Sequence, residues 1–137
     1  MDELDKEIEE LYINKKYNCC RTTMLILSKK LNVELSEDMQ KLCSFYGGGI
    51  GRSGCVCGAL IGALNIVALK YGELSDDPKN NAYKLANQIH SEFVKANEST
   101  CCKVLRGDFS KPGKNCKEII KSAILIAEDL VSRSLRK

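Results

Sequence analysis

Eight cysteines are the side chains of this 137-residue chain best suited to chemistry. In its thiolate form, cysteine is the nucleophile of disulfide exchange and a ligand for soft metals. One or two buried cysteines can serve as small apolar side chains, but eight in patterned positions need a further explanation. The eight are Cys19, Cys20, Cys43, Cys55, Cys57, Cys101, Cys102 and Cys116.

Most of these cysteines follow residues that favour the start of a helix. Serine, threonine and asparagine are preferred N-caps, and the first helical turn carries unpaired N–H groups and partial positive charge. Such a position favours thiolate, so at least one thiol should have a pKa well below the free value of about 8.5. The pairs of cap and cysteine are Asn18 with Cys19, Ser53 with Cys55 and Cys57, Thr100 with Cys101 and Cys102, and Asn115 with Cys116.

Composition narrows the class of protein. The net charge is only +3, the basic residues are dispersed and tryptophan is absent, so nucleic-acid binding is not expected. Residues 1–10 hold six acidic residues and one lysine, which is unlike a secretory signal. The most apolar stretch, residues 59–69, is shorter than the roughly 20 residues of a membrane span. We therefore expect a cytoplasmic protein away from membranes, where thiols stay reduced unless they bind metal or do redox chemistry.

Helical periodicity of apolar residues recurs along the chain, without sustained alternation of the kind typical of strands. The pattern predicts an all-α fold over 1–137, a single compact bundle of five or six helices around a central Gly/Ala-rich helix. That central helix is expected over 53–71, with Gly72 as its left-handed C-terminal residue. The other expected starts are Asn18, Ser36, Asp77 followed by Pro78, Thr100 for a short turn, and Asn115 with Glu118 in capping-box spacing. The helix that starts at Ser36 is expected to stop at the glycines of positions 47–49.

A glycine-rich segment, residues 47–54, precedes the central helix. Its backbone could approach an anion or a cluster sulfur closely, or could simply make a tight connection with positive φ angles. The segment lacks the ending of a phosphate-binding loop, so no nucleotide is expected. The residues that would line a cofactor are Gly48, Gly49, Gly51 and Arg52.

Several of these segments together resemble the C-GCAxxG-C-C family of small redox proteins, which is named for its cysteine pattern. The resemblance covers about residues 17–130, and its most specific part is the glycine-rich segment leading into Cys57, Ala59 and Gly62. It implies redox activity. Carried over position by position, the motif cysteines are Cys19, Cys57, Cys102 and Cys116. The chain departs from the pattern by reading Cys57-Gly58-Ala59 in place of Gly-Cys-Ala, with a second cysteine at Cys55.

Three functions are compatible with these residues. In the favoured one, Cys19, Cys57, Cys102 and Cys116 hold an iron–sulfur cluster for electron transfer to a redox protein partner. In the second, the protein is an oxidoreductase in which a low-pKa thiolate attacks a disulfide or an oxidant and a nearby cysteine resolves it. The candidate catalytic residues are Cys57, Cys55 and Cys19, and the neighbouring pairs are Cys55 with Cys57 and Cys101 with Cys102. In the third, the same four thiolates hold structural zinc. The sequence does not decide between enzyme and carrier, and leaves a homodimer open. Haem is not expected, because no Cys-x-x-Cys-His motif occurs.

Overall fold

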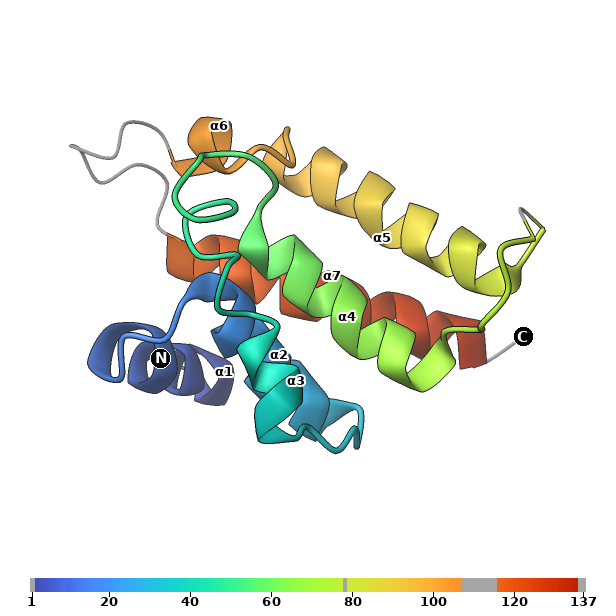
Figure 1. Cartoon of the computed structure of the whole chain (residues 1–137), viewed down its shortest axis with the longest axis horizontal. Helices are drawn as coiled ribbons and strands as arrows, with labels where there is room; N and C mark the ends of the chain where they lie inside the picture. Colours follow the sequence, from blue (N-terminus) through green and yellow to red (C-terminus); the bar gives the residue numbers. More distant parts are fainter. Residues whose placement is uncertain (1, 78, 107–115, 136–137) are drawn as a thin grey trace.

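The computed structural model describes residues 2–77, 79–106 and 116–135, and in these ranges it is helical without a strand. An isolated antiparallel bridge joins Val56 and Cys101. The all-α prediction is confirmed. The elements are α1 (Glu3–Ile8), the π-helical segment η1 (Glu9–Asn14), α2 (Cys19–Lys30), α3 (Glu37–Lys41), α4 (Gly58–Tyr71), α5 (Asn81–Asn97), α6 (Cys102–Arg106) and α7 (Cys116–Leu135), as labelled in Figure 1.

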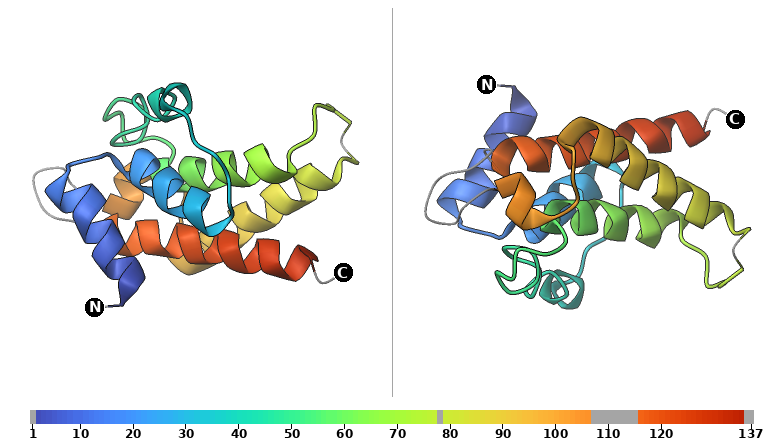
Figure 2. Two further views of the ribbon diagram at one scale, coloured as in Figure 1. Left: turned by 90° about the horizontal axis from the view of Figure 1, so that it is seen from below. Right: turned by 90° about the horizontal axis from the view of Figure 1, so that it is seen from above.

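Helix α4 lies in the middle of the bundle, in contact with α2, α5 and α7 (Figure 1). Seven of its residues are buried, among them Gly58, Gly62 and Ala63. A Cβ atom added at Gly62 would come within 2.7 Å of the carbonyl oxygen of Cys20, so the missing side chain lets α2 approach. The short helix α1 packs on α7 and crosses it near its beginning (Figure 2).

The hydrophobic core is formed by one face of each long helix, as the apolar spacing predicts. Phe93 and Ile89 of α5 and Ile120 and Ile124 of α7 are each at most 1% exposed. Full burial of such side chains contributes roughly 1.5–3 kcal/mol apiece before the entropy of ordering them is counted. This core fixes the directions of α4, α5 and α7, and therefore the place where each of them begins.

The central helix differs from the prediction at both ends, in where it begins and in the conformation of the residue that ends it. Helix α4 begins at Gly58, because residues 47–57 form a loop stabilised by its own hydrogen bonds. Gly54 therefore lies in that loop, although the sequence predicted it within the helix. Gly72 does end α4, but with φ −69° and ψ 151°, an extended conformation and not the left-handed one expected.

Two other boundaries also differ. Helix α5 is capped by Asn80, whose side chain accepts a hydrogen bond from the backbone N–H of Ala82, and not by Asp77. Helix α3 starts after Ser36 as predicted, but it ends at Lys41 and leaves Leu42 exposed. Pro78, expected in the first turn of the next helix, and Asn115, expected as the N-cap of the last helix, lie outside the described residues. Counting α3 and α6, which have five residues each, the described part of the chain has seven α-helices in place of five or six.

The N-cap predicted at Asn18 is confirmed, and it has two functions. Its Oδ1 accepts a hydrogen bond of 2.8 Å from the N–H of Arg21, and its Nδ2 donates one of 2.9 Å to the carbonyl oxygen of Cys43. One side chain therefore starts α2 and also holds the segment that follows α3.

We expect Asn18→Ala to lower the free energy of unfolding by about 1–2 kcal/mol, since both bonds are lost from a partly buried position. Urea denaturation measures this change. Asn14→Ala is the matched control, because Asn14 makes one exposed bond to Glu10 and should cost at most about 0.5 kcal/mol. Equal losses in the two variants would contradict the assigned role of Asn18.

No helix in the described ranges is both long enough and apolar enough to cross a membrane.

Candidate functional site

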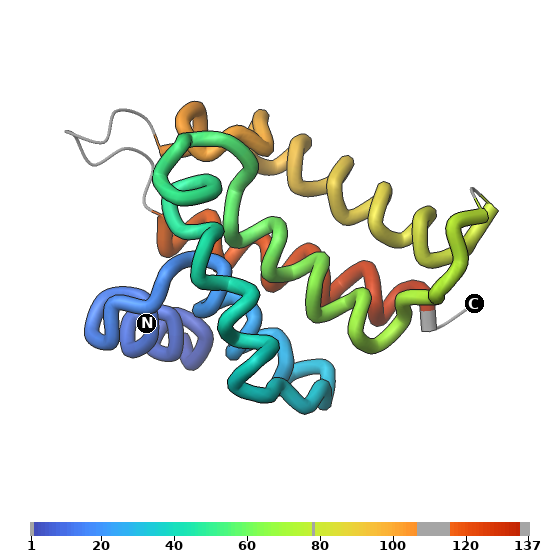
Figure 3. Tube along the Cα trace, in the orientation of Figure 1, coloured from blue at the N-terminus to red at the C-terminus, as the bar shows by residue number. Residues whose placement is uncertain are grey.

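Four cysteines lie at the beginnings of four helices. Cys19, Cys102 and Cys116 are the first residues of α2, α6 and α7, and Cys57 is the N-cap of α4. These helix starts gather at one end of the bundle, the end opposite the α4–α5 connection (Figures 1 and 3). The cap-and-cysteine spacing thus places four cysteines from distant parts of the sequence in one region.

The four thiols are close enough to interact electrostatically in every pairing. The charges of Cys57, Cys102 and Cys116 all act on the pKa of Cys19. Cys57 in turn interacts with Cys102 and Cys116, and these last two interact with each other. We call this set, Cys19, Cys57, Cys102 and Cys116, the four-thiol site.

The low thiol pKa expected from the helix starts is wrong for three of these four cysteines. Burial, together with the charges of its three neighbours, raises the pKa of Cys19 to about 12. Burial also raises the pKa of Cys57, although the backbone N–H groups of Leu60 and Ala59 act in the opposite direction. Burial likewise raises the pKa of Cys102. Desolvation and mutual repulsion of the thiolates outweigh the helix N-termini when no cation is bound.

Because the pKa of Cys19 is raised, the free energy of unfolding of the metal-free protein depends on pH in the alkaline range. The unfolded thiol titrates near 8.5 and folded Cys19 near 12, so folding favours the protonated form. That contribution is complete below about pH 8.5 and is lost as pH rises toward 12. We expect the urea midpoint to fall between pH 8 and pH 10, and to fall less in Cys19→Ser, which has no thiol to titrate at that position. A midpoint that is unchanged or higher at pH 10 would contradict the assignment.

The loop before α4 has an unusual backbone conformation. Five consecutive residues adopt left-handed φ angles, two of them with side chains that rarely do so, at a cost of roughly 1–2 kcal/mol each. Hydrogen bonds within the loop hold this conformation, including N–H of Gly51 to the carbonyl of Phe45 and N–H of Cys55 to the carbonyl of Gly49. The five residues are Gly48, Gly49, Ile50, Gly51 and Arg52.

Two glycines touch the cysteines of the site directly. A Cβ at Gly58 would lie 2.6 Å from Cys19 Sγ, and a Cβ at Gly49 would lie 2.6 Å from Cys102 Cβ. The loop also pairs with the start of α6, where the N–H groups of Cys102 and Lys103 donate to carbonyls of Cys55 and Gly54. The loop backbone therefore packs against Cys102, and the first residue of α4 packs against the thiol of Cys19. The positive φ angles of the loop agree with the interpretation of the glycine-rich segment as a tight connection.

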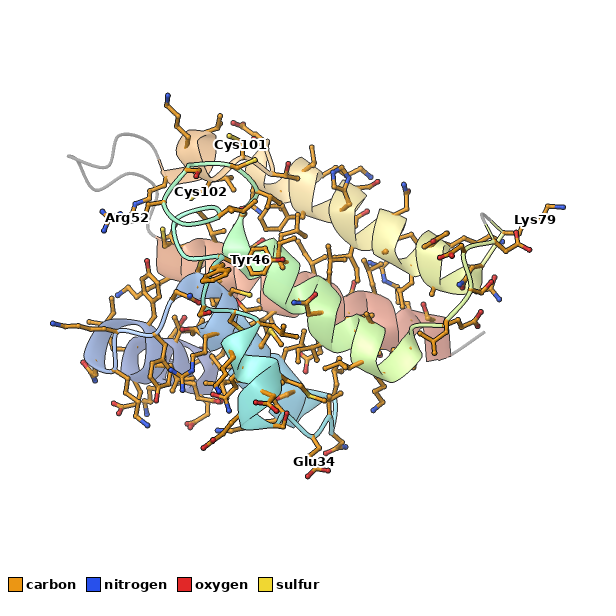
Figure 4. The ribbon with its side chains drawn as sticks, viewed as in Figure 1. Glu34, Tyr46, Arg52, Lys79, Cys101 and Cys102 are labelled. Atoms are coloured by element: carbon orange, nitrogen blue, oxygen red, sulfur yellow. The ribbon has the colours of Figure 1, made fainter. Side chains whose placement is uncertain are left out.

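An open depression of about 510 Å³ gives access to the site. Three of the four thiols, those of Cys19, Cys102 and Cys116, line it. Figure 4 shows Cys102 beside the loop and Arg52 at its outer edge. The other residues lining the depression are Tyr12, Lys16, Tyr17, Asn18, Ser44, Gly47, Gly48, Gly51, Arg52 and Arg106.

The remaining candidate cysteine pairs are arranged differently. Cys55 is exposed in the loop, whereas Cys57 is buried beneath it. Cys101 is half-buried and donates its thiol hydrogen to the carbonyl of Gly54 at 3.1 Å. In the described ranges, no group of three or more His, Cys, Asp or Glu side chains has the arrangement of a formed metal site.

Two further residues of the site could not be predicted from the sequence. Tyr12, on the π-helical segment η1, hydrogen-bonds with Cys116, and burial is the main cause that raises its pKa. Arg106, at the end of α6, acts to lower the pKa values of Cys102 and Tyr12. A tyrosine in an amphipathic helix and an arginine in a short turn are too common to indicate a site, and only the tertiary contacts reveal them.

Comparison with known proteins identifies the group to which this arrangement belongs. Residues 17–130 match the profile of the family described as "Putative redox-active protein (C_GCAxxG_C_C)". An uncharacterized protein of Archaeoglobus fulgidus is 28% identical over 127 residues, which cover 83% of this chain and 84% of the relative. No solved structure matches the chain. Because the match includes all four helix-start cysteines and the glycine-rich loop, the chain belongs to the C_GCAxxG_C_C family of redox-active proteins.

Proposed function

We propose that this protein is an electron carrier whose four-thiol site holds an iron–sulfur cluster. The observation that carries the proposal is the mutual interaction of Cys19, Cys57, Cys102 and Cys116, each from the start of a different helix. Four cysteine thiolates are the usual ligand set of such clusters, and the bound group would supply one-electron transfer.

The charges around the site fit a bound cationic group. Without one, burial and repulsion keep the thiols of Cys19, Cys57 and Cys102 protonated near neutral pH. A metal centre replaces those protons with positive charge, and so removes the repulsion that raises the pKa values. Arg106 and the first-turn N–H groups of the four helices add further compensation for thiolates.

The surrounding residues have separate tasks in this proposal. The backbone at Gly49 and Gly58 lies so close to Cys102 and Cys19 that a side chain at either glycine would collide with them. N–H groups directed at sulfur raise the reduction potential of an iron–sulfur cluster, and those of Ala59 and Leu60 act on Cys57. Tyr12 holds Cys116 through a side-chain hydrogen bond.

The thiol–disulfide alternative has weaker support. It requires a low-pKa attacking thiol, whereas burial raises the pKa of both Cys57 and Cys19. Zinc remains compatible with the same four thiolates, and metal analysis separates it from iron. Reduced thiols of this kind suit the cytoplasm, and the open depression beside Cys102 and Cys116 would face a redox protein partner.

Anaerobic purification and reconstitution with iron and sulfide test the proposal. We expect stoichiometric iron and inorganic sulfide, with visible absorption that bleaches on reduction by dithionite. Zinc alone, bound tightly and in the absence of iron, would replace this proposal with the structural-zinc alternative. Protein that takes up neither metal under these conditions would refute both.

A further inference from the structure

A second group of sulfur atoms lies outside the four-thiol site. The Sγ of Cys43 is 3.0 Å from the Sδ of Met24, and the Sγ of Cys20 is 4.0 Å from the same atom. The thiols of Cys20 and Cys43 also hydrogen-bond to each other. All three side chains are at most 1% exposed. We call Cys20, Met24 and Cys43 the buried sulfur group.

The fold holds these three side chains in place from two directions. Cys20 and Met24 are four residues apart on α2, which puts them on the same helix face. Cys43 follows α3, and its carbonyl oxygen accepts the 2.9 Å hydrogen bond from Asn18 at the start of α2. Asn65 of α4 closes the group from a third element, with its Nδ2 3.8 Å from Met24 Sδ.

From this arrangement we propose that Cys20, Met24 and Cys43 form a binding site for Cu(I). Two thiolates and one thioether are a soft donor set, which selects Cu(I) over harder cations. Binding is written as Cu⁺ plus two thiols giving a complex of net charge −1 and two released protons, without oxidation or reduction of any atom. The motif cysteines take no part in this site.

The donor spacing is close to what one ion requires. Three sulfurs about 2.3 Å from one ion in a plane stand about 4 Å apart, taking the zinc–thiolate length as a guide. Cys20 and Met24 are already at 4.0 Å, and Cys43 needs to move away from Met24 by about 1 Å. Cys43 lies in a connecting segment and not within a long helix, so this movement leaves the bundle unchanged.

The surroundings supply a compensating charge. The hydrogen bond from Cys20 is the main cause that lowers the pKa of Cys43, and the guanidinium of Arg21 acts in the same direction against burial. The same hydrogen bond and burial raise the pKa of Cys20, whose proton the bound ion would replace. The Arg21 guanidinium is fixed by stacking 3.7 Å from the centre of the Tyr17 ring and by donating from Nε to Gln40 Oε1 at 3.1 Å. A complex of charge −1 beside this cation is neutral overall, which limits the cost of burying it.

Two surface hollows lead toward the buried sulfur group. Cys43 lines one of about 500 Å³, and Met24 lines another of about 370 Å³. The second hollow is also lined by Met39, whose thioether is half-buried and offers a soft donor between solvent and Met24. An ion can therefore reach the group without passing the four-thiol site.

X-ray absorption at the copper edge tests the proposal on the full chain labelled with selenomethionine and loaded anaerobically with one equivalent of Cu(I). The chain has three methionines and the four-thiol site has none, so a selenium atom at bonding distance from copper excludes the four-thiol site, and variants of Met24 and Met39 show which methionine binds. We expect this copper–selenium signal in the native sequence and in Met39→Leu, and its loss in Met24→Leu. Bound copper with sulfur neighbours only, or a selenium signal that survives in Met24→Leu, would overturn the proposal.

Competition with a chelator that becomes coloured when it binds Cu(I) measures the affinity of the protein for Cu(I). Met24→Leu and Cys43→Ser should each weaken binding by about tenfold or more, because each removes a ligand. Cys55→Ser is the control, since Cys55 is exposed and outside the group, and it should leave the affinity unchanged. Met24→Leu nearly conserves side-chain volume, so the fold should survive, and circular dichroism checks that it does. Equal affinities in all variants would also overturn the proposal.

Discussion

Replacing any one of Cys19, Cys57, Cys102 or Cys116 by serine is expected to abolish the reconstituted visible spectrum or reduce it to a small fraction. A hydroxyl is a harder and less acidic ligand than a thiol, and the remaining three thiolates leave one metal position without its sulfur. Iron and sulfide analysis of each variant, normalised to folded protein, measures the loss. The effect should be similar at all four positions because each supplies one ligand.

Two cysteines provide matched controls for this set. Cys55 is two residues from Cys57 and Cys101 is adjacent to Cys102, so serine at these positions tests proximity in sequence without removing a proposed ligand. Both variants should retain full iron content. If Cys55→Ser lost the spectrum while Cys57→Ser kept it, the assignment of the motif cysteine within this pair would be reversed.

Gly49→Ala should be strongly destabilising, with a loss of about 2–6 kcal/mol in the free energy of unfolding. Two costs add at this position. The backbone φ of +73° is strained for alanine, and the new Cβ would lie 2.6 Å from Cys102 Cβ and 2.7 Å from the backbone nitrogen of Cys55. The variant should also lose the four-thiol site, because relief of the clash displaces Cys102. Urea denaturation and iron content are the two measurements.

Gly51→Ala separates the two costs. Gly51 has a similar φ of +55°, but nothing lies within 4 Å of a Cβ added there. This variant should lose only about 1–2 kcal/mol of left-handed strain and should still bind iron. If the two alanine variants behaved alike, close packing of the loop on Cys102 would not be the reason for glycine at position 49.

The sequence was sufficient to predict helices wherever apolar spacing and a cap agreed. Asn18 and Ser36 are correct starts because a side-chain oxygen meets the N–H three residues later. The start at Ser53 is wrong because two non-glycine residues, Ile50 and Arg52, adopt left-handed angles. Residue type alone gives no reason to expect that conformation, which depends on hydrogen bonds formed by the whole loop.

For the cysteines, too, the sequence predicted the local position but not the property that depends on tertiary packing. The spacing correctly placed cysteines at helix starts, which are local features of the sequence. The prediction of a low thiol pKa is wrong for Cys19 and Cys57, because burial and the charges of thiols distant in the sequence depend on how the helices pack. The buried sulfur group is intermediate, since the spacing of Cys20 and Met24 is visible in the sequence but the approach of Cys43 is not.

The four helix starts also determine when the site can be completed during synthesis. Its cysteines are separated by 38, 45 and 14 positions, and the last of them is residue 116 of 137. A ribosome-bound chain that ends before α7 has emerged presents at most three of the four thiols. Contacts at such separations form late, after the loops between them have closed. Metal can therefore be bound by all four thiols only after the start of α7 has emerged and packed, and a product truncated before Cys116 would be left with an incomplete set of thiols for quality control to remove.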